Sequence, residues 1–290
     1  MARLSRILVP VEFSPRCRGA AQYAEALACH FNGEIILLHV VLPPLANYSS
    51  FEAMAYSSAV DLAEEVAKQR RVELAGFPCK APGGVRNMVM IGDPARLICE
   101  VAANEKCDLI VMPTHGYGPF RRFLLGSVTA KVLHDAVCPV CTGPHMEVAP
   151  DSASFGFHQV ACAIDLALHS REVLAWADWF ARAYGAALTI VHAIPSAATR
   201  RGGFYFDPDF GVELTRHASE RIELLKADLN VKADVDIEGG ETPVVVANAA
   251  EMLKASVLII GRGSTPRAHG HLPTNAYAIV RESPCPVITI

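Results

Sequence analysis

The chain has 290 residues, of which 51% are hydrophobic, and a formal net charge of −4. This length suits two domains of ordinary size, with enough apolar residues for two packed cores. The slightly acidic balance argues against a large basic face for nucleic acid, and no apolar run approaches the roughly 18 residues of a membrane span. The short apolar run near the N-terminus does not resemble a signal peptide, so we expect a cytoplasmic protein.

Short β-branched runs alternate with helical patterns in the first half of the chain. Strands are predicted at residues 6–12, 35–41 and 109–112. The last two are apolar at successive positions, which is typical of parallel strands covered by helices on both faces. The segment 43–58 predicts a loop over the carboxyl end of the sheet, followed by helix from about Ala59.

Helix boundaries are predicted from capping residues. Ser14 and Pro15 suit the cap and the first turn of a helix. In the second half of the chain, Ser170 is predicted to cap the corresponding helix. Gly185 follows that helix, where a residue free of the Cβ penalty is favoured.

The second half of the chain repeats the first. Asp165 follows Glu12, and His192 follows His39, by the same offset, each at the end of a predicted strand. A Cys-Pro-Val run closes each half, at Cys138 and Cys285. Alternating strands and helices favour right-handed crossovers and a doubly wound sheet. We therefore predict two tandem α/β domains over residues 1–143 and 157–290, each with a five-stranded parallel sheet, joined by a Pro- and Ser-containing linker.

The segment from Met112 to Thr129 is the candidate functional site. Ligands of doubly wound sheets bind outside the carboxyl ends of the strands. Gly116 and Gly126 flank a nine-residue loop, and Ser127 begins a predicted helix. A helix N-terminus offers free N–H groups and partial positive charge, and glycine lets a phosphate approach the backbone.

This loop resembles the phosphate loop of ATP-binding universal stress proteins. The resemblance extends over nearly the whole chain, through Ile7–Ser14, His39–Val40, Thr114–Gly116, Gly126–Val128, Gly92–Pro94 and the closing Cys-Pro-Val strands. It implies a tandem two-domain member with an adenine nucleotide alpha-hydrolase-like fold in each domain. It further implies that the two copies pair within the chain as a pseudo-dimer. The apolar terminal strands, if exposed at the sheet edge, also favour pairing of two chains into a homodimer.

The resemblance implies a site for ATP or a related adenine nucleotide, with or without Mg²⁺. Val11 and Val40 would line the adenine pocket, Met112 would pack beside the nucleoside, and Glu12 stands where the family usually has Asp. The remaining site residues belong to the loop and to the predicted helix start: Pro113, Thr114, His115, Gly116, Gly126, Ser127, Val128 and Thr129. The backbone N–H groups of the glycines, Ser127 and Val128 would hold phosphates.

The sequence departs from the family pattern in both copies. Pro113 replaces the first loop glycine and has no N–H to donate, and Glu12 is one methylene longer than Asp. In the second copy, Gly261 is retained, whereas Ser264 and Thr274 replace the other loop glycines. We therefore expect the second site to bind ATP weakly or not at all.

Two other functions stay open beside nucleotide binding. The departures at Pro113 and Glu12 favour a nucleotide-independent module for unknown protein partners. Slow ATP hydrolysis is the third hypothesis, because acidic residues near a phosphate loop could order Mg²⁺ and so permit hydrolysis. No complete Walker P-loop or nucleophile elbow is present, and we assign no catalytic residue.

Some histidine and cysteine residues have positions or spacings that are found in catalytic or metal sites, but structural roles are favoured for them. His39 and His192 end buried strands, where a hydrogen-bonded structural role is favoured over catalysis. Cys138 and Cys141 have the spacing of a zinc or redox pair, but alternation along a strand places residues three apart on opposite faces, so we assign no metal site. The other cysteines, such as Cys29, are expected to be small buried hydrophobes.

Overall fold

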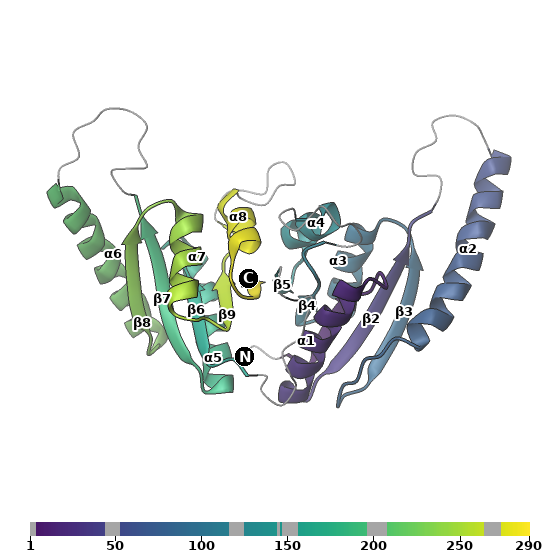
Figure 1. Ribbon diagram of the computed structural model, residues 1–290, viewed down its shortest axis with the longest axis horizontal. Helices are drawn as coiled ribbons and strands as arrows, with labels where there is room; N and C mark the ends of the chain where they lie inside the picture. Colours follow the sequence, from purple (N-terminus) through teal and green to yellow (C-terminus); the bar gives the residue numbers. More distant parts are fainter. Residues whose placement is uncertain are drawn as a thin grey trace. The chain divides into compact units, whose positions relative to one another are not determined.

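The computed structural model describes residues 4–43, 53–115, 125–143, 146, 156–195, 208–263 and 274–290 (Figure 1). These residues divide into two compact units, which are described one at a time. No helix among the described residues is long and apolar enough to cross a membrane.

The first unit is a doubly wound α/β domain. Within the described residues its parallel sheet has the strand order β3-β2-β1-β4-β5. Its elements, in chain order, are β1 (Arg6–Pro10), α1 (Pro15–Phe31), β2 (Glu34–Val41), α2 (Ala53–Ala75), β3 (Val85–Ile91), α3 (Pro94–Asn104), β4 (Leu109–Val111), α4 (Ser127–Asp135) and β5 (Val140–Thr142).

The second unit repeats this architecture. Its described strands follow the equivalent order β8-β7-β6-β9-β10, with every neighbouring pair parallel. Its elements are β6 (Gln159–Ala163), α5 (Ser170–Tyr184), β7 (Ala187–Ile194), α6 (Pro208–Leu229), β8 (Asp234–Gly239), α7 (Thr242–Met252), β9 (Val257–Ile260), α8 (Thr274–Glu282) and β10 (Val287–Thr289). The prediction of two tandem five-stranded doubly wound domains is therefore confirmed for the described residues.

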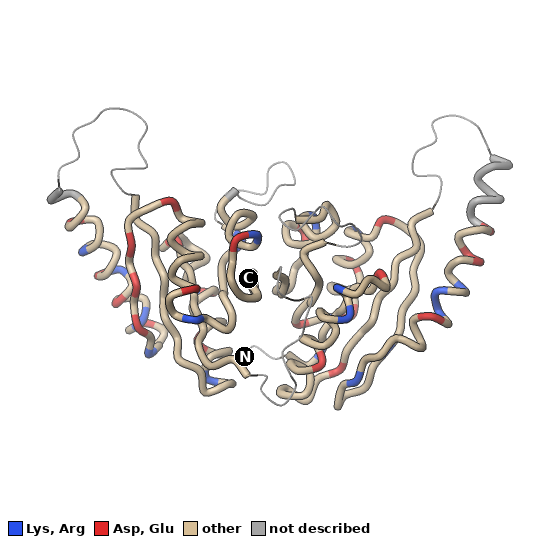
Figure 2. The backbone as a smooth tube through the Cα atoms, in the orientation of Figure 1, with Lys and Arg blue, Asp and Glu red and all other residues tan. Residues whose placement is uncertain are grey.

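Helices cover both faces of each sheet. Because the chain winds from β1 to β3 in one direction and from β3 to β5 in the other, right-handed crossovers place α1 and α2 on one face and α3 and α4 on the opposite face. The central strands are apolar on both faces, and Ile7, Leu8 and Val9 of β1 are fully buried. Charged residues are spread along α2 and α6, whereas β2 is uncharged after Glu34 (Figure 2).

The predicted helix boundaries are confirmed in part. The Ser14 hydroxyl caps α1 by accepting a hydrogen bond from the Cys17 N–H at 3.4 Å, and Gly185 ends α5 in the left-handed conformation. Ser170 was expected to cap α5 but is its first helical residue; its hydroxyl donates to Asp165 instead. The helix after the first loop begins at Ala53, six residues before the predicted Ala59; residues 44–52 lie outside the described part.

The cysteines are mostly buried thiols, with one clear exception. Cys29 is exposed near the end of α1, so its assignment as a buried hydrophobe was wrong. The buried residues of α1, such as Ala24, Leu27 and Ala28, lie on one face of the helix. Cys29 comes one residue after the end of this face, so its side chain points toward solvent. Burial raises the pKa of the Cys107 and Cys162 thiols to about 12, which leaves both protonated at neutral pH.

Candidate functional site

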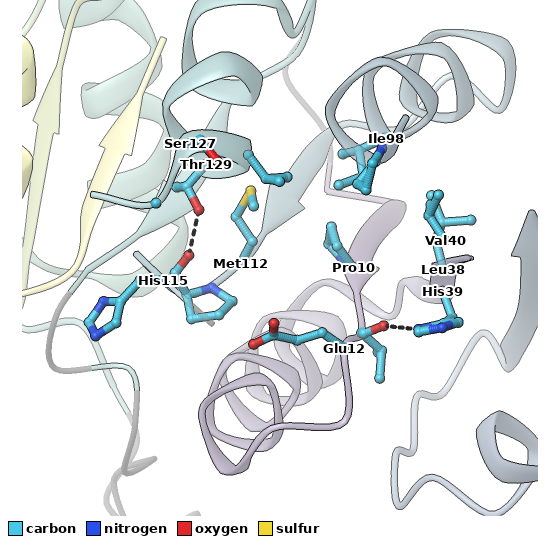
Figure 3. A pocket seen from close by; sticks show the side chains of 15 residues that line it. Pro10, Glu12, Leu38, His39, Val40, Ile98, Met112, His115, Ser127 and Thr129 are labelled. Carbon is cyan, nitrogen blue, oxygen red and sulfur yellow. Dashed lines mark hydrogen bonds between the residues drawn. The ribbon is translucent and has the colours of Figure 1, made fainter. Parts of the chain in front are cut away.

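The first unit carries a pocket where its strand order reverses. That reversal lies between β1 and β4, so their carboxyl ends diverge toward helices on opposite faces and leave a crevice. Glu12 enters the pocket from the end of β1, and Met112 enters it from the end of β4 (Figure 3). Their chain neighbours Val11 and Pro113 also line the pocket. The cavity has a volume of about 280 Å³, near the lower end of the range for small-molecule sites.

Most of the predicted site residues meet in this pocket. Those that line it are Val11, Glu12, Val40, Met112, Pro113, His115, Gly126, Ser127, Val128 and Thr129. Thr114 is not among them: it is buried, and its hydroxyl hydrogen-bonds His115 Nδ1 at 2.9 Å. Gly116 lies outside the described residues.

The start of α4 forms one wall of the pocket. Gly126 is its N-cap, and no side chain of the described residues makes a capping hydrogen bond there. The N–H groups of the first turn therefore keep their donor capacity and their partial positive charge. Ser127 is exposed at this helix start, and the Thr129 hydroxyl donates to the Pro113 carbonyl at 3.1 Å. This wall suits an anionic group.

Gly126 sits against the backbone of the opposite side of the loop. Its N–H donates to the Thr114 carbonyl at 2.8 Å. A Cβ at this position would lie 3.3 Å from the Thr114 carbonyl oxygen and 3.4 Å from the His115 Cα. A small side chain would already press on that backbone, so glycine is required for close approach rather than for an unusual φ.

Glu12 supplies the acidic group of the pocket. Its side chain extends from the end of β1 toward the segment that carries Met112 and His115 (Figure 3). The Ser14 hydroxyl donates to Glu12 Oε1 at 2.7 Å. In the second unit Asp165 is held in the same way, since its Oδ1 accepts from the Ser170 hydroxyl and the Ala167 N–H, each at 2.9 Å. Both carboxylates are thus oriented by the start of the following helix.

His39 has the structural role favoured by the sequence. Its Nδ1–H donates to the Val11 carbonyl at 2.6 Å, and His192 donates to the Ile164 carbonyl at 2.8 Å in the second unit. Burial lowers the pKa of His39, with a smaller contribution from the positive charge of Arg70. A neutral imidazole with its proton on Nδ1 fixes the strand end that leads into the pocket.

Several lining residues were missed by the sequence reasoning. Pro10, Leu38 and His39 lie on β1 and β2, while Pro94 and Ile98 come from the first turns of α3. The sequence assigned no role to the motif Gly92–Pro94, although it contains the signal for Pro94 and Ile98. Asp93 caps α3 by accepting from the Arg96 N–H at 2.9 Å, and this cap marks a helix start at the carboxyl end of β3.

The second unit has a pocket at the equivalent switch point, between β6 and β9. Asp165, His192 and Gly261 line it. Its helix α8 begins at Thr274, which therefore corresponds to Ser127 rather than to Gly126. In the sequence the residue before Thr274 is Pro273, which like Ser264 lies outside the described residues. The predicted alignment at this loop was displaced by one residue.

Two doubly wound domains in tandem, each with a switch-point pocket, define the class of protein, and comparisons define the family. The sequence model of the Universal stress protein family matches residues 4–142 and 156–290. The chain belongs to the universal stress protein family.

The chain is also similar to individual relatives and solved structures. A universal stress protein of Methanocaldococcus jannaschii is 32% identical over 139 residues, which cover 47% of this chain and 79% of that protein. A solved universal stress protein from Archaeoglobus fulgidus has the same fold over 99% of this chain and 96% of its own, with 23% identity and a TM-score of 0.64. Another from Archaeoglobus fulgidus, solved in complex with dAMP, has 19% identity and a TM-score of 0.35, covering 47% of this chain and 99% of its own.

Proposed function

We propose that the chain binds ATP or a related adenine nucleotide, with or without Mg²⁺, in the pocket of its first unit. The observation that carries this proposal is that the uncapped start of α4 and the end of β1 face one cavity. Val11, Val40 and Met112 offer apolar contacts to a base, while the helix start offers N–H donors to phosphate. Occupancy would tune a partner contact in a cytoplasmic stress response.

The opposite ends of the pocket suit the opposite ends of a nucleotide. Val40 and Ile98 lie on the side of β2 and α3, and Ser127 and Thr129 lie on the side of α4 (Figure 3). Glu12 lies between these sides, where a carboxylate can accept hydrogen bonds from ribose hydroxyls. The negative charge of Glu12 also favours a nucleotide that carries a cation on its phosphates.

Thermal melting tests the proposal. A nucleotide at a hundred times its dissociation constant stabilises the native state by about 2.7 kcal/mol. For a domain of this size the melting temperature should rise by roughly 5–10 °C. Differential scanning calorimetry with Mg-ATP, with adenosine and with inorganic phosphate separates recognition of the base from recognition of the phosphates. An unchanged melting temperature at millimolar Mg-ATP contradicts nucleotide binding.

A nucleotide-independent interaction module is the second candidate function. Pro113 favours it, because this lining residue has no N–H to offer a phosphate. An unchanged melting temperature with Mg-ATP would support this candidate.

Three other expectations from the sequence stay predictions. They are the pairing of the two copies within the chain, homodimerisation through the terminal strands, and the domain bounds 1–143 and 157–290.

A further inference from the structure

The acidic residue of each pocket is followed by a residue in the left-handed backbone conformation. Phe13 follows Glu12 with a φ of 66°, and Leu166 follows Asp165 with a φ of 58°. Residues with a side chain rarely adopt this conformation, because their Cβ crowds the backbone. Such a turn persists only where its surroundings hold it. The position of the carboxylate in each pocket therefore depends on what contacts the next residue.

In the first unit the long helix α2 holds this turn. The guanidinium carbon of Arg70 lies 5.3 Å from the centroid of the Phe13 ring, within the range of a cation–π contact. Glu73, one turn further along α2, forms a salt bridge with Arg70 and orients it. The Phe13 ring also contacts His39, with centroids 4.8 Å apart, and meets Phe77 edge-on at 6.4 Å.

In the second unit the corresponding helix, α6, holds the corresponding turn. Arg221 of α6 donates from Nη2 to the Leu166 carbonyl at 2.5 Å. The contact differs in chemistry, since a hydrogen bond to the backbone replaces a cation–π contact with a ring. Both contacts nevertheless join an arginine of the second helix to the residue after the acidic one. The recurrence of this pairing in both units favours a shared role over an accident of packing.

We propose that Arg70 and Arg221 are positioning residues, each of which fixes the turn that places the acidic side chain in the pocket of its own unit. Arg70 does not line the pocket of the first unit, and Arg221 does not line that of the second. Arg70 acts through Phe13 on Glu12, and Arg221 acts through the Leu166 carbonyl on Asp165. A ligand that engages the carboxylate is thereby coupled to α2 or α6. The effect of Arg70 on nucleotide affinity rests on the proposed function.

The test compares Arg70→Met, Arg70→Lys and Arg71→Met in the full chain. Methionine keeps the stem of Arg70 without its charge, lysine keeps the charge, and Arg71 is an exposed neighbour on the same helix. The first readout needs no ligand: amide hydrogen exchange at Val11, whose N–H donates to Leu38, and at Cys17, whose N–H donates to Ser14. The second readout is the affinity for Mg-ATP.

Arg70→Met is expected to speed exchange at Val11 and Cys17 and to weaken Mg-ATP binding, each about two- to fivefold. Arg70→Lys should restore most of the protection from exchange and most of the Mg-ATP affinity, and Arg71→Met should match the wild type in both measurements. The pKa of His39 should rise in Arg70→Met alone, because the positive charge that lowers it is lost while the negative charges of Glu73 and Glu12 remain. NMR titration of the imidazole measures this shift and verifies that the charge of Arg70 acts at the strand end. Since methionine keeps the stem of Arg70, rescue of exchange and affinity by lysine separates the charge of Arg70 from the packing of its stem.

Two results overturn the proposal: unchanged exchange in Arg70→Met, or faster exchange with unchanged affinity in a chain that binds Mg-ATP. If the wild type binds no Mg-ATP, the proposed function fails, and exchange alone then decides the role of Arg70. Arg221→Met provides an independent arm. It should speed exchange of the Ala167 amide, which donates to Asp165, and unchanged exchange there removes Arg221 from the proposal.

Discussion

Replacing Gly126 by valine is expected to lower the affinity of the first unit for Mg-ATP at least tenfold, or to abolish it. A tenfold loss corresponds to about 1.4 kcal/mol of binding free energy. A Cβ at Gly126 already lies within 3.4 Å of the Thr114 and His115 backbone, and the two methyl groups of valine would push these segments apart. The first-turn N–H groups of α4 would then move relative to the end of β1. Isothermal titration calorimetry measures the loss.

The matched control for Gly126→Val is Gly261→Val. Gly261 lines the pocket of the second unit, and a Cβ there would lie 3.2 Å from a methyl group of Val173. This variant introduces the same side chain at the other pocket, which is expected to bind no nucleotide, so it should leave the affinity for Mg-ATP unchanged. Equal losses in both variants, or no loss in Gly126→Val, would remove the start of α4 from the nucleotide site.

Replacing Phe180 by alanine is expected to lower the free energy of unfolding of the second unit by about 3–5 kcal/mol. Phe180 is fully buried on α5. Its ring stacks on Trp176 at 5.2 Å between centroids and contacts Phe157 at 5.0 Å and Tyr184 at 4.9 Å. Truncation leaves a cavity that these large rings cannot readily fill, so both the apolar transfer energy and the packing contacts are lost.

Tryptophan fluorescence reports this unfolding directly. Both tryptophans of the chain, Trp176 and Trp179, lie on α5 close to Phe180. In a urea titration, Phe180→Ala should unfold at a lower urea concentration than the wild type and show a smaller change in tryptophan emission. Leu224→Ala is the control, because Leu224 of α6 is 71% exposed and its truncation should change stability by less than about 0.5 kcal/mol. A loss below about 1 kcal/mol in Phe180→Ala would show that the aromatic cluster does not hold the second unit together.

The architecture could be predicted from the sequence because its signals are local and repeated. Apolar runs without alternation indicate strands buried on both faces, and the repeat makes each half a check on the other. Helix starts were harder to predict where side chains have competing partners. Ser170 has the chemistry of a cap, but its hydroxyl donates to Asp165, which is a contact between a helix start and a strand end that no local rule contains.

The sequence predicted the site residues that lie at strand ends and helix starts. It missed the residues that only the packing of another helix brings to the pocket. Met112 and Gly126 follow from a strand end and a helix start, and Val11 was implied by the family resemblance. Pro94 and Ile98 reach the pocket only because α3 crosses the opposite face of the sheet, and sequence spacing carries no record of that crossing. Thr114 was included because it belongs to the run that resembles the family's phosphate loop, but its side chain is buried and hydrogen-bonds His115.

The second unit shows how small changes separate two copies of one fold. Asp165, its serine partner and the histidine at the end of β7 are all retained. The helix that would receive phosphate begins at Thr274, directly after Pro273 in the sequence, where the first unit has Gly126. Proline has no N–H and carries a ring where close backbone approach needs glycine. We therefore expect one nucleotide site in each chain.

Calorimetric titration of the nucleotide-stripped full chain with Mg-ATP tests this expectation most directly. We predict saturable heat with a stoichiometry near one nucleotide per chain, lost in Gly126→Val and kept in Gly261→Val. A stoichiometry near two would contradict the assignment of the second pocket as degenerate. No heat at two temperatures would contradict nucleotide binding itself and leave the interaction module, with Pro113 as the residue that separates this pocket from a working phosphate loop.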